Sequence, residues 1–271
     1  MDITALTRHF ARIGADLEVN LVPPRQNTRW AVPTPEFALD VIQKHRTEIF
    51  EITVREDVLP AVELTPLNVR PDLRHLLLLL KREDVGGHEK FLCGHDERHW
   101  FVAAVQPAAV DVDSAMETLK PAVARLSQMR KNVRRQEWNK RHNPGFIRQG
   151  EWFFIPQPDF TPPAHSLILR NEPLQLGGRK PHMVEELFRT GGQTVYVSRR
   201  APNGISEAQY RRLIARDPAA ANAQWRTMRR NPEVYARGRV RHSDHATIVL
   251  PFWHRVAANG EPRSEQVAFL D

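Results

Sequence analysis

Residues 114–145 read SAMETLKPAVARLSQMRKNVRRQEWNKRHNPG, and this stretch divides the chain. Ser114, followed three residues later by Glu117, is typical of an N-terminal capping box, and Pro121 suits the first position of a second helical segment. Apolar residues recur every seven positions before a basic run, and the closing NPG ends the pattern. The sequence therefore predicts a long basic connecting helix over residues 113–145.

The chain before this helix mixes helical and extended patterns. An amphipathic helix is expected at residues 3–13, a further helix from Thr34-Pro35 to about His45, strands at 16–22, 50–55 and 74–82, and a hairpin at 90–105. Residues 1–112 are therefore expected to form a domain with a mixed α/β layer.

After the connecting helix, short apolar strands predominate. Strands are expected at residues 151–155, 166–170, 193–198, 246–250 and 252–257, and helices at 181–188, 206–216 and 219–230. Residues 146–271 are therefore expected to form a mostly antiparallel β unit with inserted helices. The expected fold class of the whole chain is α+β.

The composition limits the class of protein. A chain of 271 residues with 41 % hydrophobic residues, 12 Phe and 6 Trp is typical of one large or two smaller packed domains. The single cysteine excludes an intramolecular disulfide framework and a multi-cysteine zinc site. No apolar run approaches the roughly 18–20 residues that span a bilayer, and the first residues lack the apolar core of a signal peptide. We therefore expect a cytoplasmic protein without a membrane partner.

Basic residues are segregated along the chain. The protein has 39 Lys and Arg against 32 Asp and Glu, a net charge of +7. Residues 125–148 carry a net charge of +7 and residues 199–241 a net charge of +8, so the rest of the chain sums to −8. A genome rich in G and C would favour arginine but would not segregate it. The distribution therefore indicates two basic surfaces.

These two blocks favour nucleic acid as the partner. Clustered cations neutralise phosphates, and aromatic side chains between them offer platforms on which unpaired bases stack. We therefore expect RNA or single-stranded DNA to bind across both blocks, although a protein-interaction module that meets an acidic protein would show the same charge pattern. The expected nucleic-acid-binding residues are Arg130, Arg134, Arg135, Trp138, Arg141, Trp225, Arg229 and Arg230.

Histidines in the C-terminal half suggest chemistry as an alternative function. His182 lies three and four residues before Glu185 and Glu186, and His242 and His245 flank Ser243-Asp244. In a regular strand the rings of His242 and His245 would point to opposite faces, so they converge only if residues 243–244 form a turn. These five residues are the candidate catalytic group of a nuclease or other hydrolase. It would act either as a metal-free acid–base pair or with a divalent metal ion, the one cofactor that these ligands suggest.

Cys93 is a further candidate, because His95 and His99 lie close to it in the predicted hairpin and an imidazole can activate a thiol. A buried cysteine in an apolar strand is the commoner arrangement. Asp96 and Glu97 are interpreted as turn residues of the same hairpin.

Overall fold

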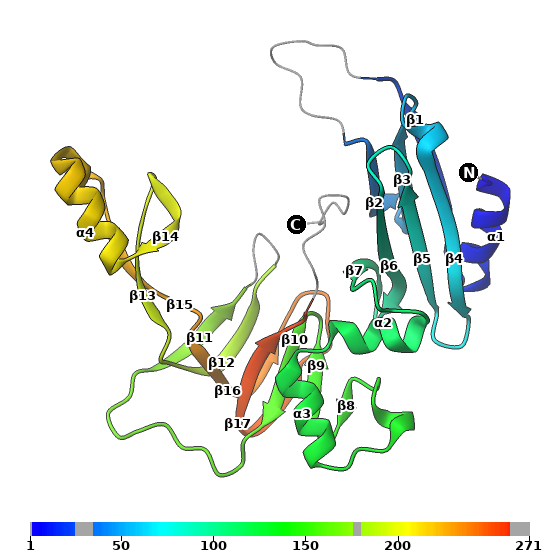
Figure 1. Cartoon of the computed structure of the whole chain (residues 1–271). Coiled ribbons are helices and arrows are strands. Elements are labelled where there is room, and N and C mark those ends of the chain that lie inside the picture. Colours follow the sequence, from blue (N-terminus) through cyan, green and yellow to red (C-terminus); the bar gives the residue numbers. More distant parts are fainter. Residues whose placement is uncertain (1, 25–34, 176–179, 261–271) are drawn as a thin grey trace.

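The computed structural model describes residues 2–24, 35–175 and 180–260. In these ranges there are four α-helices and seventeen strands, and the strands form four sheets. Figure 1 shows how these elements are arranged. The protein is mostly β with several antiparallel sheets, so the expected α+β class is wrong. No helix in the described part of the chain is long and apolar enough to cross a membrane.

Two sheets and one helix make up the N-terminal part. Their elements are α1 (Ile3–Arg12), β1 (Leu17–Val22), β2 (Phe37–Lys44), β3 (Thr47–Arg55), β4 (Val62–Arg70), β5 (His75–Arg82), β6 (Gly87–Asp96) and β7 (His99–Val105). One sheet has the order β1-β3-β2, with β1 parallel to β3, and the other is the antiparallel meander β4-β5-β6-β7. A core that contains Phe10, Phe50 and Phe91 joins α1 to both sheets.

The run of leucines in β5 reflects burial on both faces of its sheet. Leu76, Leu78 and Leu80 belong to the core shared with the first sheet. Leu77 points to the opposite face and packs in a second core with α2 (Val112–Leu119). A strand that is covered on both sides has no polar face, so the sequence loses its alternation.

The predicted connecting helix is wrong: the chain forms α2, then α3 (Ala122–Arg130), then a single 3-10 turn at Arg135–Glu137. Lys120 is extended, with ψ 131°, because a residue before proline avoids the helical region. Asn132 has a φ of +48°, which ends α3. The N-cap of α2 is Asp111, and Ser114 completes its capping box. The N-cap therefore lies three residues before the expected one, Ser114.

A seven-stranded antiparallel sheet dominates the C-terminal part. In the order in which its strands pair, it consists of β11 (Ile168–Leu174), β12 (His182–Thr190), β16 (Glu233–Arg241), β17 (Ile248–Ala258), β10 (Trp152–Pro156), β9 (Phe146–Gln149) and β8 (His142–Asn143). Its main core contains Phe154, Val184 and Leu250. A separate cluster, with Phe146 of β9 and Phe153 of β10, packs against Ala124 of α3. Helix α3 therefore packs on this sheet.

Three predicted helices are strands for at least part of their length. Residues 182–188 of the helix predicted at 181–188 belong to β12. The register of this strand shifts between Val184 and Glu186, so the buried residues Val184 and Leu187 fall three apart as they do in a helix. Residues 219–230 form a 3-10 turn and β15 (Arg226–Arg230), because pairing with β13 (Gln193–Ser198) outweighs the helical preference of alanine. The helix expected up to His45 is β2, and Thr34 lies outside the described residues.

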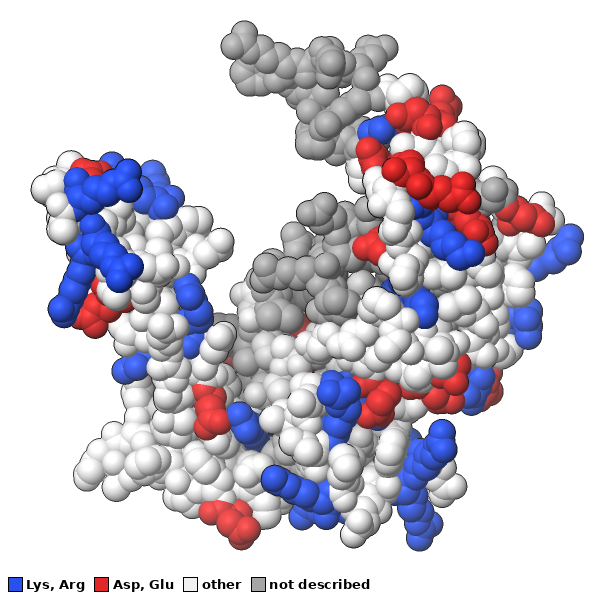
Figure 2. Space-filling view, in the orientation of Figure 1, with Lys and Arg blue, Asp and Glu red and all other residues white. Residues whose placement is uncertain are grey.

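A small arm extends from the C-terminal sheet. Its three strands have the order β14-β13-β15, with β14 at Ala201–Ser206, and α4 (Glu207–Arg216) confirms the helix predicted at 206–216. Figure 1 shows this arm at one end of the molecule and the N-terminal sheets at the other. Figure 2 shows Lys and Arg gathered over the tip of the arm and many Asp and Glu over the N-terminal sheets. The division into domains at 1–112, 113–145 and 146–271 stays a prediction.

Candidate functional site: a histidine trio beside a basic cleft

Three histidines meet at one end of the C-terminal sheet. His182 begins β12, and His242 and His245 lie in the loop between β16 and β17. The pairing of Met183 with Arg241 places His182 beside His242, and the loop bends at residues 243–245, as convergence requires. The ring centroids are 4.1 Å apart for His182 and His242 and 4.7 Å apart for His242 and His245. We call these three residues the histidine trio.

The donor atoms of the trio are close enough to act together. One ring nitrogen of each histidine lies within 4.8 Å of the others, so the trio could hold a metal ion. His182 is 1 % exposed, whereas His242 and His245 are half-buried. The backbone N–H of Asp244 donates to Nδ1 of His242 over 3.1 Å, which leaves Nε2 as the free nitrogen of that ring.

Gly150, in the turn between β9 and β10, lies against the trio. A Cβ at this position would be 2.9 Å from Nε2 of His245 and 3.4 Å from Nε2 of His182. Both nitrogens therefore face the same small space beside the Gly150 backbone. The φ of Gly150 is +56°, so glycine is favoured here by its backbone as well as by the space.

Several polar atoms around this space lack hydrogen bonds. They are both ring nitrogens of His182, Nδ1 of His245 and Oε1 of Glu151, all of them buried. Nδ1 of His245 lies 3.5 Å from Oε2 of Glu97 but is not aligned with it as a hydrogen bond. Buried polar atoms almost always have a partner in folded proteins, so their concentration here indicates a site for an ion or for water.

Glu97 links the trio to the N-terminal sheet. It lies in the turn between β6 and β7, accepts the backbone N–H of Ala246 over 3.0 Å, and forms an ion pair of 2.8 Å with Arg141. Its neighbour Asp96 forms ion pairs with Arg141 and Arg148. The hairpin turn thus fixes the loop that carries His245.

Burial lowers the pKa of two histidines of the trio, His182 and His245. Desolvation, together with the charges that the other two rings would carry, lowers the pKa of His182 to about 3. Desolvation and then His242 lower the pKa of His245, against the opposing effect of Asp96 and Glu151. Both rings are therefore neutral near pH 7, the form in which imidazole binds metals.

The two glutamates of the candidate catalytic group lie away from the trio. Glu185 accepts from the backbone N–H and Nε of Arg239, and Glu186 accepts from Nε of Arg237 over 2.6 Å. Because residues 182–190 form a strand with a bulge and not a helix, Glu185 and Glu186 do not share a side with His182. Cys93 is fully buried in β6, and desolvation raises the pKa of its thiol.

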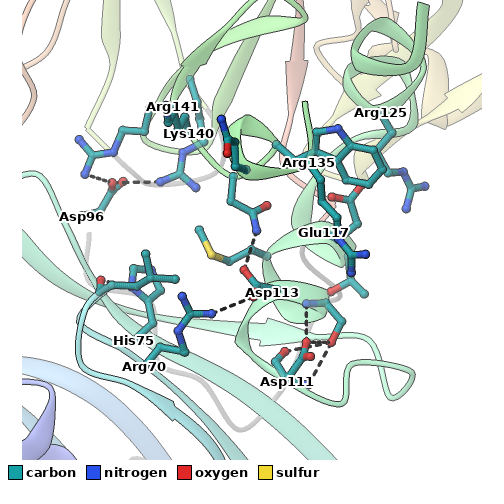
Figure 3. A pocket seen from close by; sticks show the side chains of 18 of the residues that line it. Arg70, His75, Asp96, Asp111, Asp113, Glu117, Arg125, Arg135, Lys140 and Arg141 are labelled. Atoms are coloured by element: carbon teal, nitrogen blue, oxygen red, sulfur yellow. Dashed lines mark hydrogen bonds and ion pairs between the residues drawn. The ribbon is translucent and has the colours of Figure 1, made fainter. Parts of the chain in front are cut away.

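A large cleft of about 1610 Å³ opens beside this region, and Figure 3 shows the side chains that line it. It lies between the ends of β4–β6, α2, and the segment from α3 to β9. Arg125 and Arg135 stand on one side, and the Asp96–Arg141 pair stands on the other. Asp96, Arg141 and Arg148 are shared with the surroundings of the trio, but none of the three histidines lines the cleft.

The structure divides the expected nucleic-acid-binding residues between two places. Arg134, Arg135, Trp138 and Arg141 line the cleft, whereas Arg130 does not. Trp225, Arg229 and Arg230 belong to the arm.

Some of these side chains have structural contacts. Arg230 donates to the carbonyls of Asn203 and Gly204, and Arg229 donates to the carbonyl of Gly192 over 3.5 Å. The indole N–H groups of Trp138 and Trp225 each donate to a backbone carbonyl five residues earlier. These contacts hold both indoles in place.

The sequence interpretation missed Gly150, Glu97 and Arg125. Glu97 was interpreted only as a turn residue and Gly150 was not singled out, because their approach to the trio depends on packing between distant parts of the chain. Arg125 was counted in the first basic block, and its place at the cleft follows from the orientation of α3. Comparison of the chain with models of protein families, with curated proteins and with solved structures finds no match.

Proposed function

We propose that the protein binds a divalent transition-metal ion through His182, His242 and His245. The observation that supports this function is the approach of three ring nitrogens to within 4.8 Å of one another. Three imidazole ligands suit Zn²⁺, Co²⁺, Ni²⁺ or Cu²⁺, whereas Mg²⁺ and Ca²⁺ prefer oxygen ligands. Zn²⁺ is the first candidate, because it commonly takes three protein ligands and leaves one position open.

The spacing of the trio fits such an ion after a small movement. Nitrogen ligands of a tetrahedral zinc ion lie about 3.4 Å apart when each bond is about 2.0–2.1 Å, and the three nitrogens here lie within 4.8 Å. His182 is fixed in a paired strand, so the contraction falls on the loop at residues 242–247. The ion would lie beside the backbone of Gly150, where Nε2 of His182 and of His245 face the same space.

The surroundings support the same assignment. The bond from the Asp244 N–H selects Nε2 of His242 as the ligand atom, and Glu97 lies 3.5 Å from Nδ1 of His245, on the side of the ring away from its Nε2. A carboxylate in this position orients a ligand histidine and raises its basicity.

Titration with Co²⁺ tests the proposal, because its visible spectrum reports tetrahedral nitrogen coordination. The wild-type protein is expected to bind one equivalent, and His182→Ala to bind more than about a hundredfold more weakly, since second-shell partners alone contribute 10–100-fold. Gly150→Ala fills the space beside the two nitrogens and is expected to weaken binding without removal of a ligand.

Gly191→Ala is the matched control for Gly150→Ala. Gly191 has a φ of +66° and no atom within 4 Å of an added Cβ, so this variant carries the backbone strain without filling the site. Binding of Co²⁺ that is equal in the wild type, His182→Ala and Gly150→Ala would refute the proposal.

A metal-dependent hydrolase is the second candidate, and Glu151 is the observation that favours it. One oxygen of Glu151 is buried without a hydrogen bond, and its charge raises the pKa of the neighbouring His245. An ion held by three histidines would supply an acidified water molecule with a pKa near 7, and a nearby carboxylate could accept its proton.

The test of this second candidate is cleavage of bis(p-nitrophenyl) phosphate, which is expected of the wild-type protein loaded with Zn²⁺ or Mn²⁺. Glu151→Gln would retain the metal and lose the activity, whereas an inactive wild-type protein that binds metal excludes this second candidate alone.

A further inference from the structure

Each acidic residue of the cleft has an ion-pair or hydrogen-bond partner within the protein. Asp96 is paired with Arg141 and Arg148, and Asp113 with Arg70 over 2.9 Å. The remaining two acids also have partners: Asp111 caps α2, and Glu117 lies 2.6 Å from Nζ of Lys120. The cleft therefore offers an incoming ligand no unpaired carboxylate.

Three arginines of the cleft have guanidinium groups without a hydrogen bond or ion pair in the described part of the chain. They are Arg125, Arg134 and Arg135, and all three are exposed. Arg125 belongs to α3, and Arg134 and Arg135 belong to the segment that follows it. Figure 3 shows Arg125 and Arg135 on the same side of the cleft. The free charge of the cleft is thus cationic and carried by guanidinium groups, which bind phosphate oxygens in pairs.

An apolar pocket of about 310 Å³ adjoins this side of the cleft. It shares Glu117, Arg125 and Trp138 with the cleft and is otherwise formed largely by α3. Leu126 and Met129 of this pocket are 49 % and 65 % exposed. Two exposed apolar side chains beside an indole form a surface that a planar, uncharged group can cover.

The ring of Trp138 is held ready for such a contact. Its Nε1 donates to the carbonyl of Val133 over 2.8 Å, its own carbonyl accepts from Gln128, and Nζ of Lys120 lies 5.9 Å from the ring centroid. The indole therefore loses little conformational freedom when a ligand binds, which increases affinity.

We propose that the cleft and the apolar pocket together bind a single-stranded polynucleotide. Arg125, Arg134 and Arg135 contact consecutive phosphates, and one base enters the pocket against Trp138. This arrangement combines a cationic groove with an aromatic platform, as proteins that bind single strands do. A base must be unpaired to enter the pocket, so a duplex binds more weakly than a single strand.

The combination of features distinguishes this ligand from others. A concave cleft does not match a flat lipid surface, and an acidic peptide has no planar, apolar group next to each anionic group. A nucleotide joins an anionic phosphate to a planar base, the two chemistries that Arg125 and Trp138 place side by side. The proposal does not depend on the metal site.

Fluorescence anisotropy with labelled twelve-residue RNA and DNA strands tests the phosphate contacts. Both strands are expected to bind, with an affinity that falls as salt rises. Arg134→Gln/Arg135→Gln weakens binding by more than about tenfold at low salt and lowers the log–log salt slope by about 1.4, or about 0.7 for each lost phosphate contact. Arg130→Gln is the matched control, because Arg130 is exposed and close in sequence but lies outside the cleft.

The base pocket needs its own variant and ligand. Leu126→Ser/Met129→Ser changes only half-exposed or exposed side chains and leaves the charge unaltered. It is expected to weaken binding of the strand about fivefold or more and to leave binding of a base-free strand of the same length unchanged. Absence of binding at low salt overturns the proposal. Equal affinity for the base-free strand, for a duplex or for an acidic peptide also overturns it, in favour of a general anion or protein surface.

Discussion

The imidazole of His182 stacks on that of His242 with 4.1 Å between the ring centroids. Two positive charges at this distance would repel each other by about 4 kcal/mol at the effective dielectric constant near a protein surface, so a positive charge on both rings at once is disfavoured. The contact follows from the pairing of β12 with β16, which fixes both residues at the same end of the sheet. The strand pairing thus places two imidazole rings in contact, an arrangement that a shared metal ion would stabilise.

Replacement of Glu97 by glutamine should weaken the metal site without loss of the fold. The amide oxygen of glutamine can still accept the N–H of Ala246. The negative charge that lies 3.5 Å from Nδ1 of His245 is lost, however, and no longer raises the basicity of that ring. We expect the affinity for Zn²⁺ to fall about 10–100-fold, measured by competition with a chromophoric chelator. Glu207→Gln, which removes an exposed carboxylate on the arm, serves as the control. An unchanged affinity in Glu97→Gln would remove this residue from the site.

His254 should make the stability of the protein depend on pH. It is 1 % exposed, and burial lowers the pKa of its ring below the ordinary value of 6.5, against the opposing effect of its bond to the Phe252 carbonyl. The unfolded chain therefore binds this proton first as the pH falls below 6.5. Stability decreases with a slope of up to about 1.4 kcal/mol per pH unit and is fully present above this range.

Urea unfolding at several pH values from 7 to 5 measures this effect. His254→Phe retains an aromatic ring beside Phe252, whose ring lies 4.7 Å away, and should flatten the decrease. His88→Asn, an exposed position on β6, should leave the profile unchanged. A profile of His254→Phe that is parallel to that of the wild type would contradict the assignment.

Cys93 should not react in the folded protein. Its side chain is 0 % exposed, and burial raises the pKa of the thiol, so neither access nor the thiolate form is available. A colorimetric thiol reagent at pH 8 is expected to label the native chain very slowly and one thiol per chain after addition of urea. Rapid labelling of the native chain would contradict this prediction and support a nucleophilic role for Cys93.

Asn132 distinguishes the observed end of α3 from a helix that continues towards residue 145. Its φ of +48° is left-handed, so Asn132→Ala should destabilise the fold by about 1 kcal/mol, while Asn132→Gly should be neutral or stabilising. In a continuous helix the order would be reversed, because alanine favours helix and glycine disfavours it. Urea unfolding of the two variants determines the sign.

Strands with clear alternation or high β-branched content could be predicted from the sequence, and helices were overpredicted. The strand at 193–198 and the helix after Ser206 are found as expected, because their local signals are not opposed by packing. The bulge in β12 gave its buried residues a helical spacing. In residues 113–145, Pro121 disfavours a helical conformation of Lys120, and this effect could be read from the sequence. The apolar repeat continues on both sides of Pro121, however, so the sequence indicated one helix where the structure has two.

The site could be predicted only in part. The approach of His242 to His245 depended on a turn, which the sequence suggested as a condition, whereas the approach of His182 depended on strand pairing across a long stretch of chain. The cationic wall of the cleft followed from the charge block. The ion pairs that neutralise Arg141 and Arg148 come from the opposite hairpin, which no local pattern indicates.

X-ray absorption at the zinc edge, on protein loaded with one equivalent of Zn²⁺, tests the metal site most directly. The proposed site predicts scattering from three imidazole rings at about 2.0–2.1 Å with one further light ligand, and a loss of one ring in His182→Ala. Fewer than two imidazoles in the wild type, or an identical spectrum in His182→Ala, would contradict a metal site at the histidine trio.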